Sequence, residues 1–110
     1  MNVEHFNHLN WLEPWEPTTH DFEAELHREL IAGHPLFGVR AIAVGRRCDC
    51  DDVLFLLSEH SSPLAVVHLT WQRETTPDWP HTELYASLAD WIERCMKPDS
   101  LEYSEGNPAN

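Results

Sequence analysis

The sequence predicts a single α+β domain in which two helices flank a three-stranded antiparallel meander, in the order α-β-β-β-α. Three observations favour this class. A chain of 110 residues holds one hydrophobic core of useful size. Two segments repeat apolar residues at helical spacing, and three apolar runs rich in β-branched residues lie between them. The connections between these runs are short, which favours antiparallel neighbours.

The first helix is expected from Thr19 to Ala32, after an irregular arm formed by residues 1–17. Thr18 is a favourable N-cap, and Asp21 follows it like the second half of a shortened capping box. Phe22, Leu26 and Leu30 form an apolar stripe along the helix. Gly33 and Pro35 are then expected to end it.

Three strands are expected next, at Val39–Val44, Val53–Leu57 and Leu64–Trp71. A sheet with one wet face shows alternation of apolar and polar residues. The second and third runs are almost continuously apolar, so both faces of the sheet are expected to be covered. With both helices on one face, the other face needs a cover, which the N-terminal arm, a second copy of the chain or a partner could supply.

The second helix is expected from Thr82 to Met96, after a loop over Gln72–His81 that contains two prolines. Pro98 is expected to end this helix. The domain therefore spans residues 18–98, and residues 99–110 form a polar tail. The residues expected in the core are Phe22, Leu26, Leu30, Leu54, Leu56, Val66, Leu84, Leu88 and Ile92.

The charge of the chain is its most unusual global property. Nineteen acidic residues oppose seven basic ones, so the net charge is −12 with neutral histidines. Direct binding to nucleic acid is disfavoured, because phosphate contacts require clustered Lys and Arg. A basic protein partner suits this charge, and solubility alone is the competing explanation.

Several absences predict where the protein resides. No apolar run approaches the ~20 residues of a membrane span. The first residues lack the basic start and apolar stretch of a secretion signal. The chain has three cysteines, and an odd number argues against a disulfide framework. These features predict a cytoplasmic protein that does not bind membranes.

The loop after the first strand has the densest set of reactive side chains. Cys48 and Cys50 could bind zinc together with histidine. No second cysteine pair is present and the only spaced histidine pair is His5 with His8, so a solvated loop without metal or cofactor is predicted. His68 could act as a catalytic base, although a buried, hydrogen-bonded histidine is the commoner situation. A small enzyme or metal-binding protein built on His68 and this loop is the alternative function.

Acidic and aromatic side chains supply the candidates for a protein-binding surface. Asp49, Asp51 and Asp52 lie in one short loop, and Trp79 lies in the proline-containing loop. Tryptophan is enriched at binding hot spots, although a lid over a small sheet is its more ordinary role. A second acidic group, on the first helix, consists of Glu23, Glu25 and Glu29.

Three stretches resemble small bacterial proteins of unassigned function: DDVLF (Asp51–Phe55), VVHLTW (Val66–Trp71) and WPHTELYASLADWIERCM (Trp79–Met96). This resemblance implies no activity and no functional residue. In size, acidity and mixed helix and strand content, the chain is also similar to immunity proteins of bacterial toxin systems and to phage-encoded inhibitors. The expected function is therefore an immunity protein or inhibitor that occludes a basic site on a toxin or a nucleic-acid-binding enzyme. A structural homodimer is a further alternative.

Overall fold

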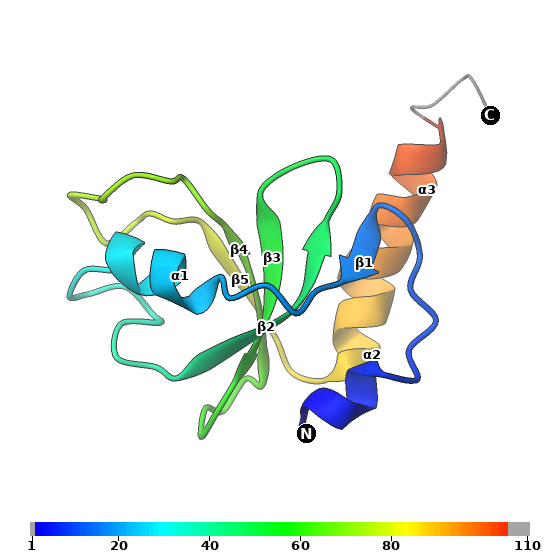
Figure 1. Cartoon of the computed structure of the whole chain (residues 1–110), viewed down its shortest axis with the longest axis horizontal. Helices are drawn as coiled ribbons and strands as arrows, with labels where there is room; N and C mark the ends of the chain where they lie inside the picture. Colours follow the sequence, from blue (N-terminus) through cyan, green and yellow to red (C-terminus); the bar gives the residue numbers. More distant parts are fainter. Residues whose placement is uncertain (1, 106–110) are drawn as a thin grey trace.

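The computed structural model describes residues 2–105 and contains a five-stranded antiparallel sheet whose strand order follows the chain (Figure 1). The strands are β1 (Trp15–Pro17), β2 (Ala41–Arg47), β3 (Asp52–Leu57), β4 (Leu64–His68) and β5 (Thr82–Tyr85). The expected α+β class is confirmed. The three-stranded meander is wrong, because a short strand extends the sheet at each edge.

The helices lie before and after the four longer strands. A 3-10 turn, η1 (Val3–Phe6), lies near the start of the chain, and α1 (Glu23–Glu29) precedes β2. After β5, α2 (Leu88–Trp91), the π-helical turn η2 (Ile92–Met96) and α3 (Lys97–Glu105) follow one another without a break, and we call residues 88–105 the C-terminal helix. Ser87 caps its start, since the Ser87 hydroxyl accepts a hydrogen bond from the Asp90 N–H at 3.0 Å.

The two faces of the sheet have separate hydrophobic cores. In β3, Val53 and Phe55 face the core under α1, whereas Leu54 and Leu56 face the core under the C-terminal helix on the other side. Adjacent strand residues point to opposite faces, so a sheet covered on both sides requires a continuous apolar run. The N-terminal arm completes the second cover with buried residues such as Trp15. The two main helices therefore lie on opposite faces, not on one face as expected.

The second predicted helix begins too early. Residues 82–85 form β5 and pair with β4 along their full length. Leu84 packs against the core under α1 and Tyr85 belongs to the core under the C-terminal helix, which is strand geometry. The helical spacing of Leu84 and Leu88 misled the prediction because it joins a strand residue to a helix residue.

Pro98 does not end the C-terminal helix. A proline ring inside a regular α-helix clashes with the carbonyl group four residues before it. Here a π-helical turn precedes the proline, and the Lys97 N–H donates to the Ile92 carbonyl. The helix therefore continues as α3 to Glu105, and residues 106–110 of the expected polar tail lie outside the described residues.

The remaining boundaries differ from expectation by a few residues. The helix α1 is shorter than predicted, because the Thr18 and Asp21 side chains accept hydrogen bonds two residues ahead and hold residues 18–22 in turns. The N-terminal arm is not irregular throughout, since it contains η1 and β1. Of the predicted core, Phe22, Leu26, Leu30, Leu54, Leu56 and Val66 are buried, and Leu84, Leu88 and Ile92 are half-buried. Across residues 2–105, no helix combines the length and the apolar character that crossing a membrane requires.

Candidate functional site

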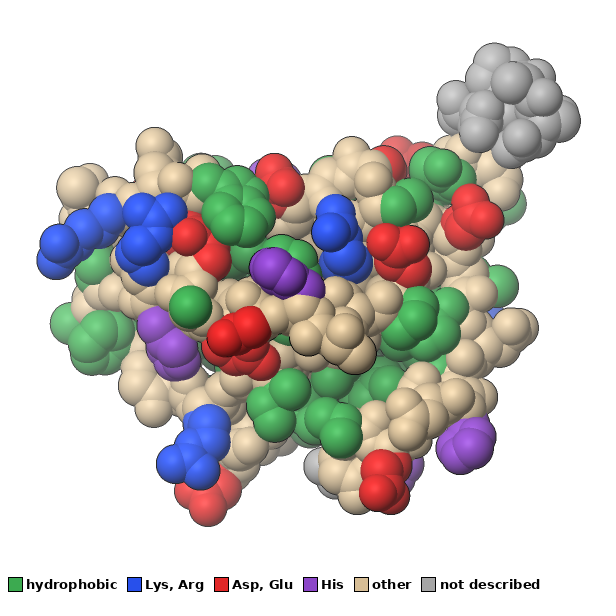
Figure 2. Space-filling view, viewed as in Figure 1, with side chains coloured by type: hydrophobic (Ala, Val, Ile, Leu, Met, Phe, Trp, Pro, Cys, Tyr) green, Lys and Arg blue, Asp and Glu red, His purple; other side chains and the backbone are tan. Residues whose placement is uncertain are grey.

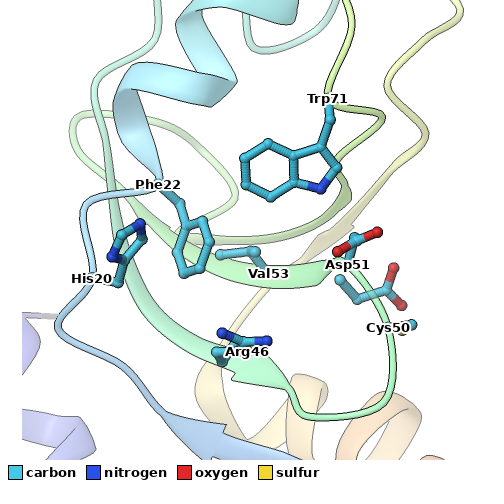
Figure 3. Close-up of a pocket in the computed structure, with 8 residues that line it drawn as sticks. His20, Phe22, Arg46, Cys50, Asp51, Val53 and Trp71 are labelled. Atoms are coloured by element: carbon cyan, nitrogen blue, oxygen red, sulfur yellow. The ribbon is translucent and has the colours of Figure 1, made fainter.

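A hollow of about 330 Å³ opens on the side of the sheet that α1 covers (Figure 3). Three segments line it: the residues just before α1, the hairpin that joins β2 to β3, and the segment that follows β4. Its walls combine aromatic and apolar side chains with charges of both signs. The lining residues are His20, Phe22, Arg46, Cys50, Asp51, Asp52, Val53 and Trp71.

Trp71 has an unusual backbone conformation. Its φ angle is 61°, in the left-handed region that large side chains rarely adopt. The residue is 48% exposed, and its ring lies edge-on to Phe22 with 6.4 Å between ring centroids. Such strain costs roughly 1–3 kcal/mol and persists only where the surroundings impose it.

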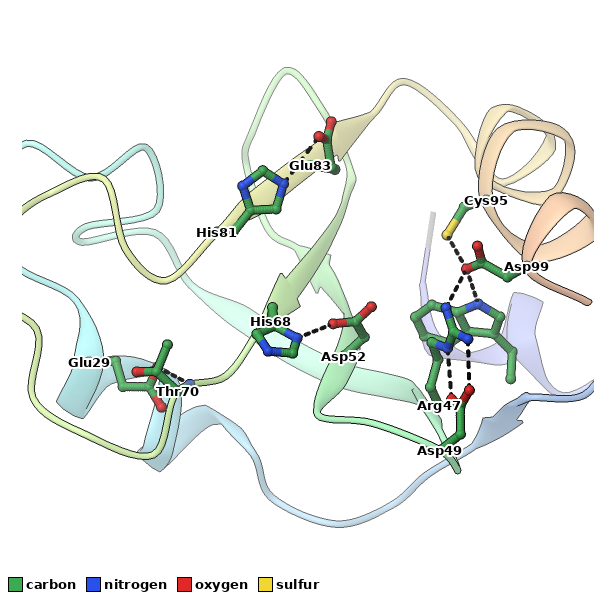
Figure 4. Close-up of polar contacts among 11 residues, drawn as sticks. Glu29, Arg47, Asp49, Asp52, His68, Thr70, His81, Glu83, Cys95 and Asp99 are labelled. Atoms are coloured by element: carbon green, nitrogen blue, oxygen red, sulfur yellow. Dashed lines mark hydrogen bonds and ion pairs between the residues drawn. The ribbon is translucent and has the colours of Figure 1, made fainter. Parts of the chain in front are cut away.

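Glu29, the last residue of α1, supplies that constraint. Its carboxylate is fully buried and accepts hydrogen bonds from the Thr70 N–H at 2.8 Å and the Thr70 hydroxyl at 3.0 Å (Figure 4). It also accepts a hydrogen bond from the Trp71 N–H at 2.9 Å. Hydrogen bonds to a charged group contribute roughly 1.5–3 kcal/mol each. Burial raises the pKa of the Glu29 carboxyl, and the donors from Thr70 and Trp71 oppose that rise. Glu29, which the sequence placed on a partner-binding surface, therefore lies in the interior and holds the segment that contains Trp71.

Arg46 forms the wall opposite Trp71 (Figure 3). Its guanidinium carbon lies 5.8 Å from the centre of the Phe22 ring, within the range of a cation–π contact. Its Nε atom lies 3.9 Å from a carboxylate oxygen of Glu16 on β1. The hairpin register positions this side chain, because Arg46 lies opposite Val53 across β2 and β3. The cation that lines the hollow, Arg46, therefore already has contacts with the Phe22 ring and the Glu16 carboxylate.

The three loop acids have different environments. The Asp49 carboxylate accepts two hydrogen bonds from Arg47, at 2.9 and 2.8 Å, which lower its pKa. The Asp52 carboxylate lies 2.6 Å from His68 Nδ1 (Figure 4). Asp51 is exposed and lines the hollow, and within residues 2–105 its carboxylate has no ion-pair or hydrogen-bond partner. Asp51 therefore presents an unoccupied acceptor to the hollow.

Arg47 and Asp49 belong to a polar cluster that ties the hairpin to the C-terminal helix. The Arg47 guanidinium also lies 3.3 Å from the Asp99 carboxylate on α3. The same carboxylate accepts a hydrogen bond from the buried Trp15 indole at 2.9 Å (Figure 4). This arrangement gives Asp49 a structural contact, so its charge is already matched by Arg47.

The other predicted binding residues do not line the hollow. Glu23 accepts a hydrogen bond from a β2 backbone N–H at 2.7 Å, and burial raises its pKa. Glu25 is only 12% exposed at its side chain and pairs with Arg28 at 2.9 Å. Trp79 is 48% exposed but is absent from the lining of the hollow. The tryptophan beside the acidic loop is therefore Trp71 rather than Trp79.

The residues considered for catalysis or metal binding are His68, Cys48 and Cys50. His68 is exposed rather than buried, and its contact is with Asp52. Cys48 is exposed and Cys50 is half-buried, and both are free thiols. Burial raises the pKa of the Cys50 thiol, which disfavours the reactive thiolate at neutral pH. In the described part of the chain, no three His, Cys, Asp or Glu side chains are grouped so that they could hold a metal ion.

Sequence reasoning identified the acidic side of the hollow and missed its aromatic side. Asp51 was a candidate from composition alone, whereas Trp71 was expected to end the third strand. The strand ends at His68, and the chain then turns at Trp71. The pattern that could have indicated this wall is a tryptophan shortly after β4 together with an arginine near the end of β2.

The chain matches no protein-family model, no curated protein and no solved structure. The resemblance to small bacterial proteins therefore stays a prediction, and the geometry and charge of the hollow are the basis for a functional assignment.

Proposed function

We propose that the protein is an acidic binding module that occludes a basic site on a target protein, in the manner of an immunity protein or inhibitor. The binding face contains the hollow, Trp71 and Asp51. One observation supports it most directly: the buried carboxylate of Glu29 holds a large aromatic residue in a strained, exposed position beside an unoccupied acid. Backbone strain concentrates at functional sites, and tryptophan is typical of binding hot spots.

The charge of the whole chain supports a basic partner. A net charge of −12 produces a negative potential around the molecule, which attracts basic proteins and accelerates their association. Figure 2 shows acidic side chains spread across one face, with Lys and Arg in small separate groups. Most of the bases are already engaged in ion pairs: Arg28, Arg46, Arg47, Arg94 and Lys97.

Occlusion requires only binding and no chemical step. Trp71 would pack against the target and exclude water, and Asp51 would pair with a target Lys or Arg at the edge of the contact. A target that uses a basic surface to bind nucleic acid would then lose access to that surface. The acidic module competes for the same cations that a phosphate backbone would contact.

The proposal is tested with a target recovered from the native host by the immobilised chain and then purified. The informative variant is Trp71→Gly, because glycine adopts a positive φ angle without strain and the fold is retained. Its complex should dissociate about tenfold faster or more, as expected for a hot-spot tryptophan. Trp79→Gly is the matched control, since Trp79 has the same 48% exposure and does not line the hollow.

Salt dependence supplies the second measurement. Association of the wild-type chain should slow by about tenfold or more between low and physiological salt, while dissociation changes little. The triple variant Asp49→Asn, Asp51→Asn, Asp52→Asn should show a weaker salt dependence, because it removes three of the 19 acidic charges of the chain. Equal effects of the two tryptophan variants, or association that is independent of salt, would show that this face is not the interface.

A further inference from the structure

We infer that the hollow is an anchor for one arginine side chain of the partner. The inference rests on the proposed function, because it names the group that the binding face takes up. It depends on three properties of the hollow: its size, its open acceptor and its aromatic walls.

The size of the hollow fits one long side chain. Its volume of about 330 Å³ lies at the lower end of the range for ligand pockets, which is roughly 300–1,000 Å³. Phe22 and Val53 form an apolar floor, and Trp71 forms one wall (Figure 3). Such a shape accommodates an aliphatic stem and a flat head group. Asp51, which is exposed and lines the hollow, supplies a polar partner for the head group.

The charges around the hollow select a cation. Asp51 presents a carboxylate without a partner in the described chain, whereas His68 already contacts Asp52. The positive charge of Arg46 is partly offset by Glu16, whose carboxylate oxygen lies 3.9 Å from Arg46 Nε. An incoming cation therefore meets one open carboxylate and a cation that is already paired, within a chain of net charge −12.

The aromatic walls favour a guanidinium over an ammonium group. A guanidinium is planar, weakly hydrated and able to stack on an aromatic face while it donates two hydrogen bonds to a carboxylate. The hollow already contains one such contact, since the Arg46 guanidinium lies over the Phe22 ring at 5.8 Å. Trp71 offers a second aromatic surface beside Asp51 (Figure 3). Glu29 holds the backbone of Trp71 in place before binding, which reduces the entropic cost of binding.

The test uses N-acetyl-L-arginine amide as the probe and the indole N–H signals of the five tryptophans as the readout in ¹H–¹⁵N NMR spectra. Trp71→Gly removes one signal and thereby assigns it. The arginine compound should shift the Trp71 signal with a Kd in the millimolar range. The matched lysine compound should bind about threefold more weakly or worse, and the neutral isostere N-acetyl-L-citrulline amide should cause no shift.

Asp51→Asn is the second variant, and it is expected to fold because Asp51 is exposed and makes no contact through its carboxylate in the described chain. It should weaken arginine binding by about threefold or more. Asp49→Asn is the control in the same loop, because the Asp49 carboxylate already accepts two hydrogen bonds from Arg47. This variant should leave arginine binding unchanged. Equal binding of citrulline, equal effects of the two Asn variants, or no shift of the Trp71 signal would overturn the arginine anchor.

The two proposals fail in different ways. If Trp71→Gly weakens the target complex but the arginine compound does not bind, the binding face stands and the anchor is wrong. If the arginine compound binds in the hollow but Trp71→Gly and salt leave the target complex unchanged, the proposed function is wrong.

Discussion

Glu29 shows how a single residue can be misread from composition. On the sequence it is one of several acids of the first helix, and exposed acids usually contribute to solubility. In the structure it is fully buried at the end of α1, where the helix dipole disfavours a negative charge. Three hydrogen bonds from Thr70 and Trp71 offset that cost. The residue stabilises the chain reversal after β4.

Replacing Glu29 with glutamine tests this role. In Glu29→Gln an amide nitrogen replaces one carboxylate oxygen, so a donor faces the N–H group of Thr70 or Trp71. The free energy of unfolding at neutral pH should fall by about 1–3 kcal/mol, the cost of an unsatisfied buried group. Urea unfolding measures it, and Glu102→Gln on the exposed side of α3 is the control. Equal effects of the two changes would contradict the role assigned to Glu29.

The pH dependence of stability gives a second test of Glu29. Burial raises its folded-state pKa above the ordinary value of 4.5, so the folded chain binds the proton more readily than the unfolded chain. The contribution of Glu29 to the free energy of unfolding is therefore least favourable at a pH where its carboxyl is ionised in both the folded and the unfolded chain. It improves as pH falls through the folded-state pKa toward 4.5. The wild type should gain stability relative to Glu29→Gln over that window, and a relative loss would mean that the hydrogen bonds lower the pKa instead.

At the scale of elements, Asp99 couples the C-terminal helix to β1 and β2. Its carboxylate accepts a hydrogen bond from the Trp15 indole and lies 3.3 Å from Arg47. Asp99→Ala leaves the buried indole N–H without this acceptor, and the free energy of unfolding should fall by about 1–3 kcal/mol. Glu102→Ala on the exposed side of the same helix should change it by less than about 0.5 kcal/mol. Chemical unfolding of both variants measures the difference, and similar values would show that the cluster has no stabilising role.

The central elements were predictable because their patterns are strong. Continuous apolar runs identified β3 and β4, and the stripe of Phe22 and Leu26 identified α1. The edge strands were not predictable, since β1 and β5 have three and four residues and no alternation that distinguishes them from loops. The hollow combines Asp51, which composition indicates, with Trp71. The position of Trp71 depends on a φ angle and on a buried carboxylate that no local pattern reveals.

At the scale of the whole molecule, the excess of acids opposes the compact state. Charges of one sign repel when the chain folds, and salt screens that repulsion. Raising NaCl from about 20 mM to about 200 mM should therefore raise the melting temperature by roughly 2–5 °C. Scanning calorimetry measures this shift, and the triple Asn variant of Asp49, Asp51 and Asp52 should show a smaller one. A falling melting temperature would indicate that the attractive pairs around Arg47 outweigh the repulsion.

The two short edge strands also determine how copies of this chain meet one another. The apolar β3 run, Val53–Leu57, would be an aggregation hazard if its backbone were free to pair with another molecule. It is enclosed between β2 and β4 instead. The strands at the borders are poor templates, because Pro17 in β1 has no N–H to donate and Glu16 and Glu83 carry charges that repel the same strand of a second copy. Growth of the sheet by addition of further strands is thereby opposed at both edges, so a high concentration of the chain does not by itself favour assembly through its strands.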